Sequence, residues 1–467
     1  MPAAEKQQKG KMLMRFMLFT VMLTSMNAQM FHVVLPQINE EFDLTLAQVS
    51  WLSSAYTLIY AFGTVTYGKL ADRFQLKTLL TFGILLFAAG SLIGLVSKTF
   101  AAALLGRCLQ SAGAAAVPAI SLIIPVRYFS PEHRGSAISM TAVGVALGSA
   151  LAPFVSATIV SFANWRWLFV PSLLVLALLP LYRKRLDYEP KENSPFAFDW
   201  IGGSLLALAV SLLLMGFTNQ TWWFLLISLA ALLLFLARIH KAKKPFIDPK
   251  LFENKSYLSG LLLAFLIAGI GISFHMVPPV LFAKIYQWDS SRIGFAMVPA
   301  AIAASLLGRQ GGKLADRKGN AFAFTLASGL IMTSFVLLST FPENSPVWIA
   351  LFLIFGNVGQ SFMQITLSSS VSRTLPADRA GAGMGLFSMT SFIAQGIGSV
   401  VYGWAADQSP AISLNPLNTG SASAMFSTLY LMLAAFHAGI LLVYRRRFIP
   451  ENSKVSLQGL GNEKVRR

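Results

Sequence analysis

An all-α membrane protein with fourteen transmembrane helices in two related halves is the fold class that the sequence predicts. Three observations predict it: long apolar stretches, the placement of the positive charges, and an internal repeat. Apolar residues make up 55% of the 467 residues and charged residues only 12%, whereas soluble domains carry about 25% charged residues. Mean hydropathy is +0.62. None of the 19 acidic residues lies deep within an apolar stretch, which excludes a series of soluble domains.

Fourteen stretches have the roughly 20 apolar residues that a helix needs to cross a bilayer. They begin near Leu13, Val49, Thr78, Ala101, Ser136, Trp167, Ile201, Thr221, Ser256, Ile293, Ala321, Pro346, Gly381 and Ala424. The first is too long for a signal peptide and is therefore predicted to be a span. The single cysteine, Cys108, excludes disulfides within the chain and cysteine metal clusters.

The net charge of +18 has two explanations, nucleic-acid binding or the positive-inside bias of membrane proteins. With the N-terminus inside, the cytoplasmic loops and tails hold 31 of the 37 Lys and Arg residues. The exceptions are four on the outer side and two within spans: Lys98, Arg166, Lys284, Arg292, Arg107 and Arg309. This distribution predicts a multi-pass protein of the cytoplasmic membrane with both termini cytoplasmic, and no nucleic-acid partner.

The hexapeptide GKLADR occurs twice, at Gly68–Arg73 and Gly312–Arg317, each time after the second span of a half. Duplicated halves are common in transporters. The repeat predicts an N-terminal six-helix bundle (1–185), a two-helix insert with basic linkers (186–250), a C-terminal six-helix bundle (251–450) and a cytoplasmic tail (451–467).

The two hexapeptides are candidate gating loops, in which small residues let helix ends approach closely. Aspartate there accepts hydrogen bonds from a helix N-terminus or pairs with a neighbouring base. The candidate residues are Gly68, Asp72, Arg73, Gly312, Asp316 and Arg317.

Three motifs resemble those of the major facilitator superfamily. GKLADRFQLK resembles its signature loop, and Arg107-x-x-Gln110-x-x-Gly113 its fourth-helix motif. Gly148 followed by Ala152-Pro153 resembles the antiporter motif of its exporters. Fourteen spans are similar to the fourteen-helix drug:proton antiporters, and AGAGMGLFSMTSF and HMVPPV resemble the Gram-positive tetracycline efflux proteins. The resemblance implies a secondary active exporter of amphipathic small molecules, coupled to proton influx.

The fifth expected span carries small residues every four positions, at Gly144, Gly148, Ala152 and Ser156. Such a stripe permits close helix packing, and Pro153 removes a backbone donor and favours a bend. Two interpretations remain: a gate between the bundles, or an ordinary packing face.

Polar residues within the spans are candidates for a central substrate cavity. Arg107 is costly inside a membrane, so a functional role is the first hypothesis and a structurally paired arginine the second. For the uncharged residues, interhelical hydrogen bonding is the alternative. The candidate cavity residues are Asn27, Gln29, Phe31, Arg107, Gln110, Asn357, Gln360, Gln364 and Gln395.

Proton coupling in this family depends on membrane carboxylates, but their usual positions are occupied here by Asn27 or Ala28, Ser149 and Gln395, which do not titrate. The candidates that remain are His32, His275, Asp72, Asp316 and Arg107, and the histidines are either a proton relay or satisfied polar residues. The alternative function is a facilitator or exporter without proton coupling, for an organic solute or lipid-like metabolite. A non-transporting scaffold is disfavoured by the duplicated loops. We expect no enzyme activity, cofactor or metal; the expected partners are a small-molecule substrate, protons and the bilayer.

Overall fold

The computed structural model describes residues 3–129, 131–186, 199–242, 245–375, 380–408, 413–418 and 420–464, and these form helices with no β-strand among them. The first half contains α1 (Ala3–Met30), α2 (Leu35–Phe42), α3 (Leu46–Val49), α4 (Trp51–Arg73), α5 (Leu76–Leu95), α6 (Phe100–Ala114), α7 (Ala116–Tyr128), α8 (Pro131–Phe162), η1 (Trp165–Phe169), α9 (Val170–Leu173), η2 (Leu174–Leu178) and α10 (Leu179–Arg185). The insert contains α11 (Trp200–Asn219) and α12 (Trp222–Lys241). The second half contains η3 (Pro249–Glu253), α13 (Lys255–Gly271), α14 (Ser273–Tyr286), α15 (Ser290–Lys318), α16 (Asn320–Thr340), α17 (Pro346–Ser372), α18 (Ala380–Asp407) and α19 (Ala424–Lys464).

Among the described residues, 12 helical segments are long and apolar enough to cross a membrane, or 13 if the bent pair α1–α2 counts as one span. The fourteenth expected span corresponds to α4, which has 23 residues and therefore sufficient length. Its polar residues, such as Ser54 and Thr57, keep it outside the hydropathy count. Their hydroxyl groups donate to the backbone carbonyls of Gly396 and Ser53. Hydropathy alone thus recovers twelve to thirteen spans rather than fourteen.

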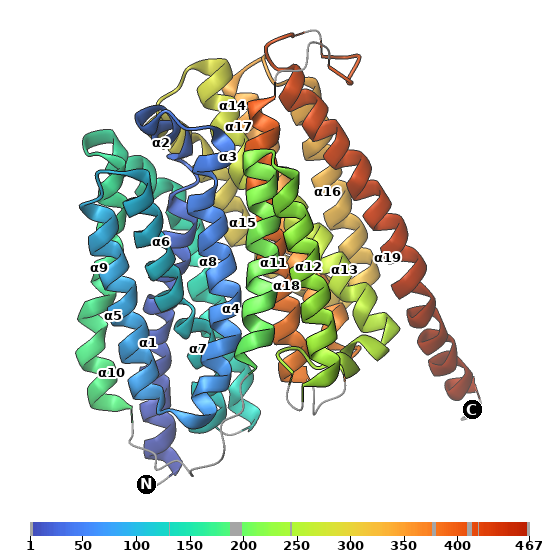
Figure 1. The fold of residues 1–467 in the computed structure, drawn as a ribbon. Coiled ribbons are helices and arrows are strands. Elements are labelled where there is room, and N and C mark those ends of the chain that lie inside the picture. The colour runs from blue at the N-terminus through green and yellow to red at the C-terminus, as the bar shows by residue number, and fades with distance from the viewer. Residues whose placement is uncertain are drawn as a thin grey trace.

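Figure 1 shows the first half on the left, the second half on the right and behind, and the insert across the front. Both chain ends lie at the lower side, here termed the terminal face, and α2 and α3 lie at the opposite face. The halves meet where α8 packs on α15 and α4 on α18. Helix α11 packs on both α4 and α18. The domain boundaries expected from the sequence stay a prediction.

The first half is held together by backbone contact between α5 and α6. A Cβ atom on Gly90 would overlap the backbone nitrogen of Gln110 and the carbonyl oxygen of Gly106. On the facing helix, a Cβ atom on Gly106 would lie 2.8 Å from the backbone nitrogen of Gly94. Glycine therefore sets the separation of these helices, and with it the position of Arg107 on α6.

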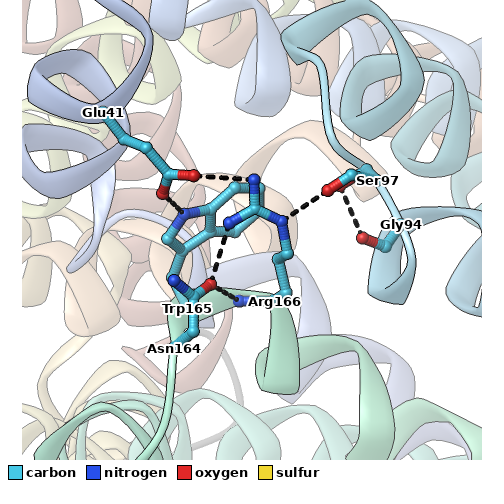
Figure 2. Close-up of polar contacts among 6 residues, drawn as sticks. All are labelled: Glu41, Gly94, Ser97, Asn164, Trp165 and Arg166. Carbon is cyan, nitrogen blue, oxygen red and sulfur yellow. Dashed lines mark hydrogen bonds and ion pairs between the residues drawn. The ribbon is translucent and has the colours of Figure 1, made fainter.

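A polar cluster ties three segments of the first half together at the opposite face (Figure 2). The Glu41 carboxylate accepts from Trp165 Nε1 at 2.5 Å and pairs with Arg166 at 2.7 Å. Arg166 also donates to the carbonyl oxygen of Ser97 and to Asn164 Oδ1. This cluster joins α2 to η1 and to the connection between α5 and α6.

At the opposite face, Asp407 connects the two halves directly. Its carboxylate, at the end of α18, accepts from the N–H groups of Leu46 and Ala47 on α3 at 3.0 and 3.1 Å. One turn earlier, a Cβ atom on Gly403 would lie 2.7 Å from the Leu46 carbonyl oxygen. The second half thus caps a helix of the first half where their backbones are in contact.

Asp199 anchors the insert at the terminal face. Its carboxylate accepts from the N–H groups of Gly202 and Phe246 and pairs with Arg238 at 3.1 Å. Burial raises the pKa of Asp199, but these hydrogen bonds and the charge of Arg238 outweigh burial and hold the pKa below its usual value. The insert is therefore fixed at the start of α11, the end of α12 and the linker that follows.

The substitution Gly90→Ala is expected to lower the free energy of unfolding by about 1–3 kcal/mol, because the two helix backbones must separate to admit a methyl group. Gly329→Ala is the matched control, since Gly329 also lies within a helix but a Cβ atom there has nothing within 4 Å. The midpoint of thermal unfolding in detergent, measured for both variants, tests this. Equal midpoints contradict it.

Asp407→Ala is expected to favour opening of the opposite face, because it removes both acceptors that join α18 to α3. A loss of about 1–2 kcal/mol shifts the balance of states by roughly five- to thirtyfold. Spin labels on Lys98→Cys and Asn344→Cys in a Cys108→Ser background report the separation of the halves, since both positions are exposed.

Asp289→Ala is the control for Asp407→Ala. It removes a carboxylate from the same face, but Asp289 caps α15 within the second half and pairs only locally with Arg292. Longer label distances are expected in Asp407→Ala and not in Asp289→Ala. The same distance distribution in both variants means that Asp407 does not hold the halves together.

Candidate functional site

A cavity of about 440 Å³ lies at the seam between the two halves, which is within the size range of small-molecule sites. Helices α1 and α8 contribute its wall from the first half, and α13, α14, α15, α17 and α18 from the second. The polar side chains that line it are Gln29, His32, Ser149, His275, Ser305, Asn357, Gln360, Ser361, Gln364 and Gln395. The larger apolar ones are Val33, Val145, Pro153, Ile272, Met297, Leu353 and Ile365.

The first helix of the first half breaks beside this cavity. Between α1 and α2 the chain turns through Phe31–Val34 and bends by 52°. Pro36 has no N–H to donate to the His32 carbonyl, so the helix does not continue there. In the second half α13 and α14 together form one span, Lys255–Tyr286, which meets the cavity at Ile272 and contains Pro278 and Pro279 within α14. Irregular backbone within a membrane is tolerated where it lines a cavity.

His32, in the break between α1 and α2, and His275, near the start of α14, lie together across the seam. Their ring centroids lie 6.1 Å apart, and both side chains line the cavity. His32 Nδ1 lies 3.0 Å from Met276 Sδ and 3.2 Å from Ser53 Oγ. His275 Nδ1 is buried and has no hydrogen-bond partner in the described part of the chain. Each histidine lies shortly before a proline in the first span of its half, His32 before Pro36 and His275 before Pro278, and in the structure the two are neighbours.

Five of the nine candidate cavity residues line the cavity, and all five carry amides: Gln29, Asn357, Gln360, Gln364 and Gln395. Two of them bind neighbouring carbonyls. Asn357 Nδ2 donates to Leu353 at 2.9 Å, and Gln360 Nε2 donates to Ile267 at 3.4 Å. Gln29 Oε1 is buried without a partner among the described residues. Each side-chain amide has two N–H donors and a carbonyl acceptor, so the amides that line the wall retain groups that a bound molecule can pair with.

The other four candidates, Asn27, Phe31, Arg107 and Gln110, do not line the cavity, and the prediction is corrected for them. They form a buried cluster inside the first half, because Arg107 is enclosed by its own bundle. Arg107 Nη1 donates to Asn27 Oδ1 at 2.7 Å and to Gln110 Oε1 at 3.1 Å. Its guanidinium lies between two aromatic faces, 4.2 Å from the Phe31 ring centroid and 4.1 Å from that of Tyr56.

Arg107 is a buried cation held by neutral groups. It is 0% exposed, and no ion pair to it is present among the described residues. Its Nη2 atom has no hydrogen-bond partner there. The cluster extends through neutral side chains, since Asn27 and Gln110 donate in turn to Ser172 and Ser91. The interactions that hold this charge are thus amide acceptors and aromatic faces.

The family model of the Major Facilitator Superfamily matches residues 17–399. The chain belongs to the major facilitator superfamily. Quinolone resistance protein NorB of Staphylococcus aureus (strain COL) is 25% identical over 456 residues, which are 95% of this chain and 98% of NorB. Multidrug resistance protein 3 of Bacillus subtilis (strain 168) is 24% identical over 370 residues, 76% of this chain and 72% of the relative. Riboflavin transporter RibZ of Clostridioides difficile (strain 630) is 24% identical over 376 residues, 78% and 81% of the two chains.

Solved transporter structures share the fold. A bacterial homologue of the human lysosomal transporter Spinster, inward-facing and unoccupied, superposes with a TM-score of 0.64 at 15% identity and covers 95% of this chain and 98% of its own. The peptide transporter POT with alafosfalin gives a TM-score of 0.69 at 18% identity, over 93% and 94% of the two chains. The family and the fold are those of multi-pass membrane transporters rather than enzymes.

The segments expected to be gating loops of this superfamily are helical. Gly68–Arg73 forms the last turns of α4, and Gly312–Arg317 lies in α15. A Cβ atom on Gly68 has nothing within 4 Å, so glycine does not serve close helix approach there. The chain turns just beyond each hexapeptide, in the second half at Gly319, whose φ of 85° favours glycine. The side chains of Asp72 and Asp316 lie outside the described residues.

The small-residue stripe of α8 packs within the first half, as expected of an ordinary packing face, and the gate between the bundles stays a prediction. A Cβ atom on Gly144 would lie 2.7 Å from the Leu18 carbonyl of α1, and Ser156 Oγ donates to the Met30 carbonyl. The other face of α8 meets the second half. There a Cβ atom on Gly294 would lie 3.1 Å from the Pro153 carbonyl. Helix α8 continues through Pro153 without interruption.

Sequence reasoning missed the small residues that make room for the cavity. On α8 these are Ala142, Ala146 and Ala150, and on α15 they are Ala300, Ala301, Ala304 and Ser305. The signal was present as alanine at spacings of three to four on both helices. Alanine at such spacing is equally typical of helix packing, so the pattern alone did not distinguish a cavity wall from a contact.

Proposed function

We propose that the chain exports amphipathic small molecules, drug-like or tetracycline-like, across the cytoplasmic membrane by alternating access coupled to proton influx. The observation that carries this proposal is the central cavity, which both halves line and beside which the first helix of the first half is broken. Discontinuous helices at the interface of repeats are typical of transporter substrate sites. The similarity to proteins named for multidrug and quinolone resistance supports an exporter.

Alternating access requires a seam that opens on either side. At the opposite face the halves are joined by Asp407, and a second, polar pocket of about 630 Å³ lies at the same seam. Gln37 and Glu40 line it from the first half and Asp289 and Arg292 from the second. Rocking of the halves about the central cavity would break the Asp407 contact and join the two pockets. The positive-inside bias assigns the terminal face to the cytoplasm.

Proton coupling is assigned to His32 and His275, the titratable groups among the described residues that line the cavity. Two positions where the family's carboxylates fall, Ser149 and Gln395, also line it but do not titrate. A proton on either imidazole converts an acceptor into a donor where substrate would bind. Asp72, Asp316 and Arg107 remain candidates at the helix ends and in the buried cluster.

The alternative is a facilitator or exporter of an organic solute or lipid-like metabolite without proton coupling. One observation favours it: no Asp or Glu occurs among the described residues that line the cavity. The relative named as a riboflavin transporter supports a metabolite as substrate. The two functions differ in one measurable quantity, the response of substrate flux to a pH gradient.

The double variant His32→Ala, His275→Ala is expected to lose accumulation of norfloxacin or tetracycline driven by an acidic lumen in everted vesicles, and to retain counterflow exchange. The reason is that the coupling groups are lost while the cavity remains. His437→Ala is the matched control, since His437 is also a buried histidine of a span but does not line the cavity.

Two outcomes decide between the functions. If wild-type protein moves substrate at a rate that a pH gradient does not change, the uncoupled alternative replaces the antiporter. If the double variant keeps wild-type coupling, the histidines are not the relay.

A further inference from the structure

We propose that the central cavity selects uncharged, hydrogen-bonding amphiphiles and discriminates against lipophilic cations. The reason is the positive charge of Arg107, which lies behind the cavity wall and forms no ion pair with the described residues. This inference rests on the proposed function, since it names the substrate class of the same cavity. Two independent observations carry it: the chemistry of the wall and the environment of the buried cation.

The wall recognises polar groups without charge. Amides of Gln29, Asn357 and Gln364 face the cavity from both halves, and each amide donates and accepts. No Asp, Glu, Lys or Arg occurs among the described residues that line it. Buried without partners are Gln29 Oε1 and His275 Nδ1. A substrate that hydrogen-bonds the cavity-facing amides gains affinity without bringing a charge.

The fixed positive charge lies directly behind this wall. The Phe31 ring covers the Arg107 guanidinium at 4.2 Å, and the next residue, His32, lines the cavity. The partners of Arg107 are neutral, and among the described residues none forms an ion pair with it. Its field is therefore not cancelled locally.

The sign of that field decides which substrates bind. At roughly 10 Å and an effective dielectric constant of about 20, one unit charge disfavours another of the same sign by on the order of tenfold in affinity. Salt screens a buried charge much less than an exposed one. The affinity for a lipophilic cation is lowered by this factor, and no carboxylate among the described residues of the wall offsets the repulsion. The affinity for an uncharged molecule of the same shape is not lowered by this repulsion.

Nile red and Nile blue test this directly, because they share one tetracyclic ring system and differ in charge. Nile red is a neutral ketone and Nile blue a cation. Binding is measured by dye anisotropy at pH 8 with the full chain in phosphatidylcholine nanodiscs, corrected with empty nanodiscs. We expect wild-type protein to bind Nile red at least about tenfold more tightly than Nile blue.

Two pairs of variants separate charge from structure. Arg107→Gln is expected to bring the two dissociation constants within about threefold of each other, whereas Arg107→Lys keeps the charge and the preference. Gln364→Glu places a carboxylate in the cavity and is expected to shift the preference toward Nile blue by at least about tenfold. Gln220→Glu adds the same charge at an exposed turn and leaves the preference at the wild-type value.

The results separate the two proposals. Equal or tighter binding of Nile blue by wild-type protein overturns the charge selection, and dye efflux from expressing cells then leaves the exporter intact. An unchanged preference in Gln364→Glu also overturns the selection, which keeps the test decisive if Arg107→Gln does not fold. Absence of binding and of efflux for both dyes contradicts the proposed function and this inference together.

Discussion

A chain inside hydrocarbon must pair its backbone N–H and C=O groups within itself, and this constraint determines both the fold and the site. Every candidate span in the described part of the chain is helical. Interruptions are tolerated only where other groups or a cavity meet the freed backbone. The break at Phe31–Val34 lies at the seam, where Pro36 cannot donate the hydrogen bond that would continue the helix. The residues that prevent a regular helix therefore also locate the site.

Small side chains serve two kinds of helix contact: close backbone contacts within one half, and looser contacts between the halves. Glycine brings α5 and α6 into backbone contact, and the stripe of α8 does the same on α1, so each of these pairs lies within one half. Between the halves, α8 uses its other face, where alanines leave space for the cavity. One helix thus belongs firmly to its own bundle and still forms part of the seam. The contact of Asp407 with α3 is polar and local, which suits an interaction that breaks when the halves rock.

The sequence predicted the fold class and the family, because hydropathy and repetition are local signals. It did not predict that Arg107 and Gln110 turn away from the cavity. Asn357 and Gln360 have the same spacing in the second half, with a serine after Gln360 as after Gln110, and they face the cavity. Repeat symmetry matches positions along the chain, but the larger guanidinium is enclosed by aromatic rings and amides. The GKLADR segments were expected to be loops because they contain glycine and charge. They are helical because nothing in them breaks a helix before Phe74 or Gly319.

Competition between a proton and a substrate does not require a carboxylate in this cavity. When His32 or His275 is neutral, the imidazole offers an acceptor to the substrate; a proton removes that acceptor and adds positive charge beside Arg107. Under the proposed coupling, a substrate that donates a hydrogen bond to the neutral imidazole binds less well to the protonated cavity, which is the relation that antiport needs. Exchange of an uncharged molecule for a proton also moves one net charge per cycle. Both the pH gradient and the membrane potential then drive export, whereas exchange of a monovalent cation for one proton would use the pH gradient alone.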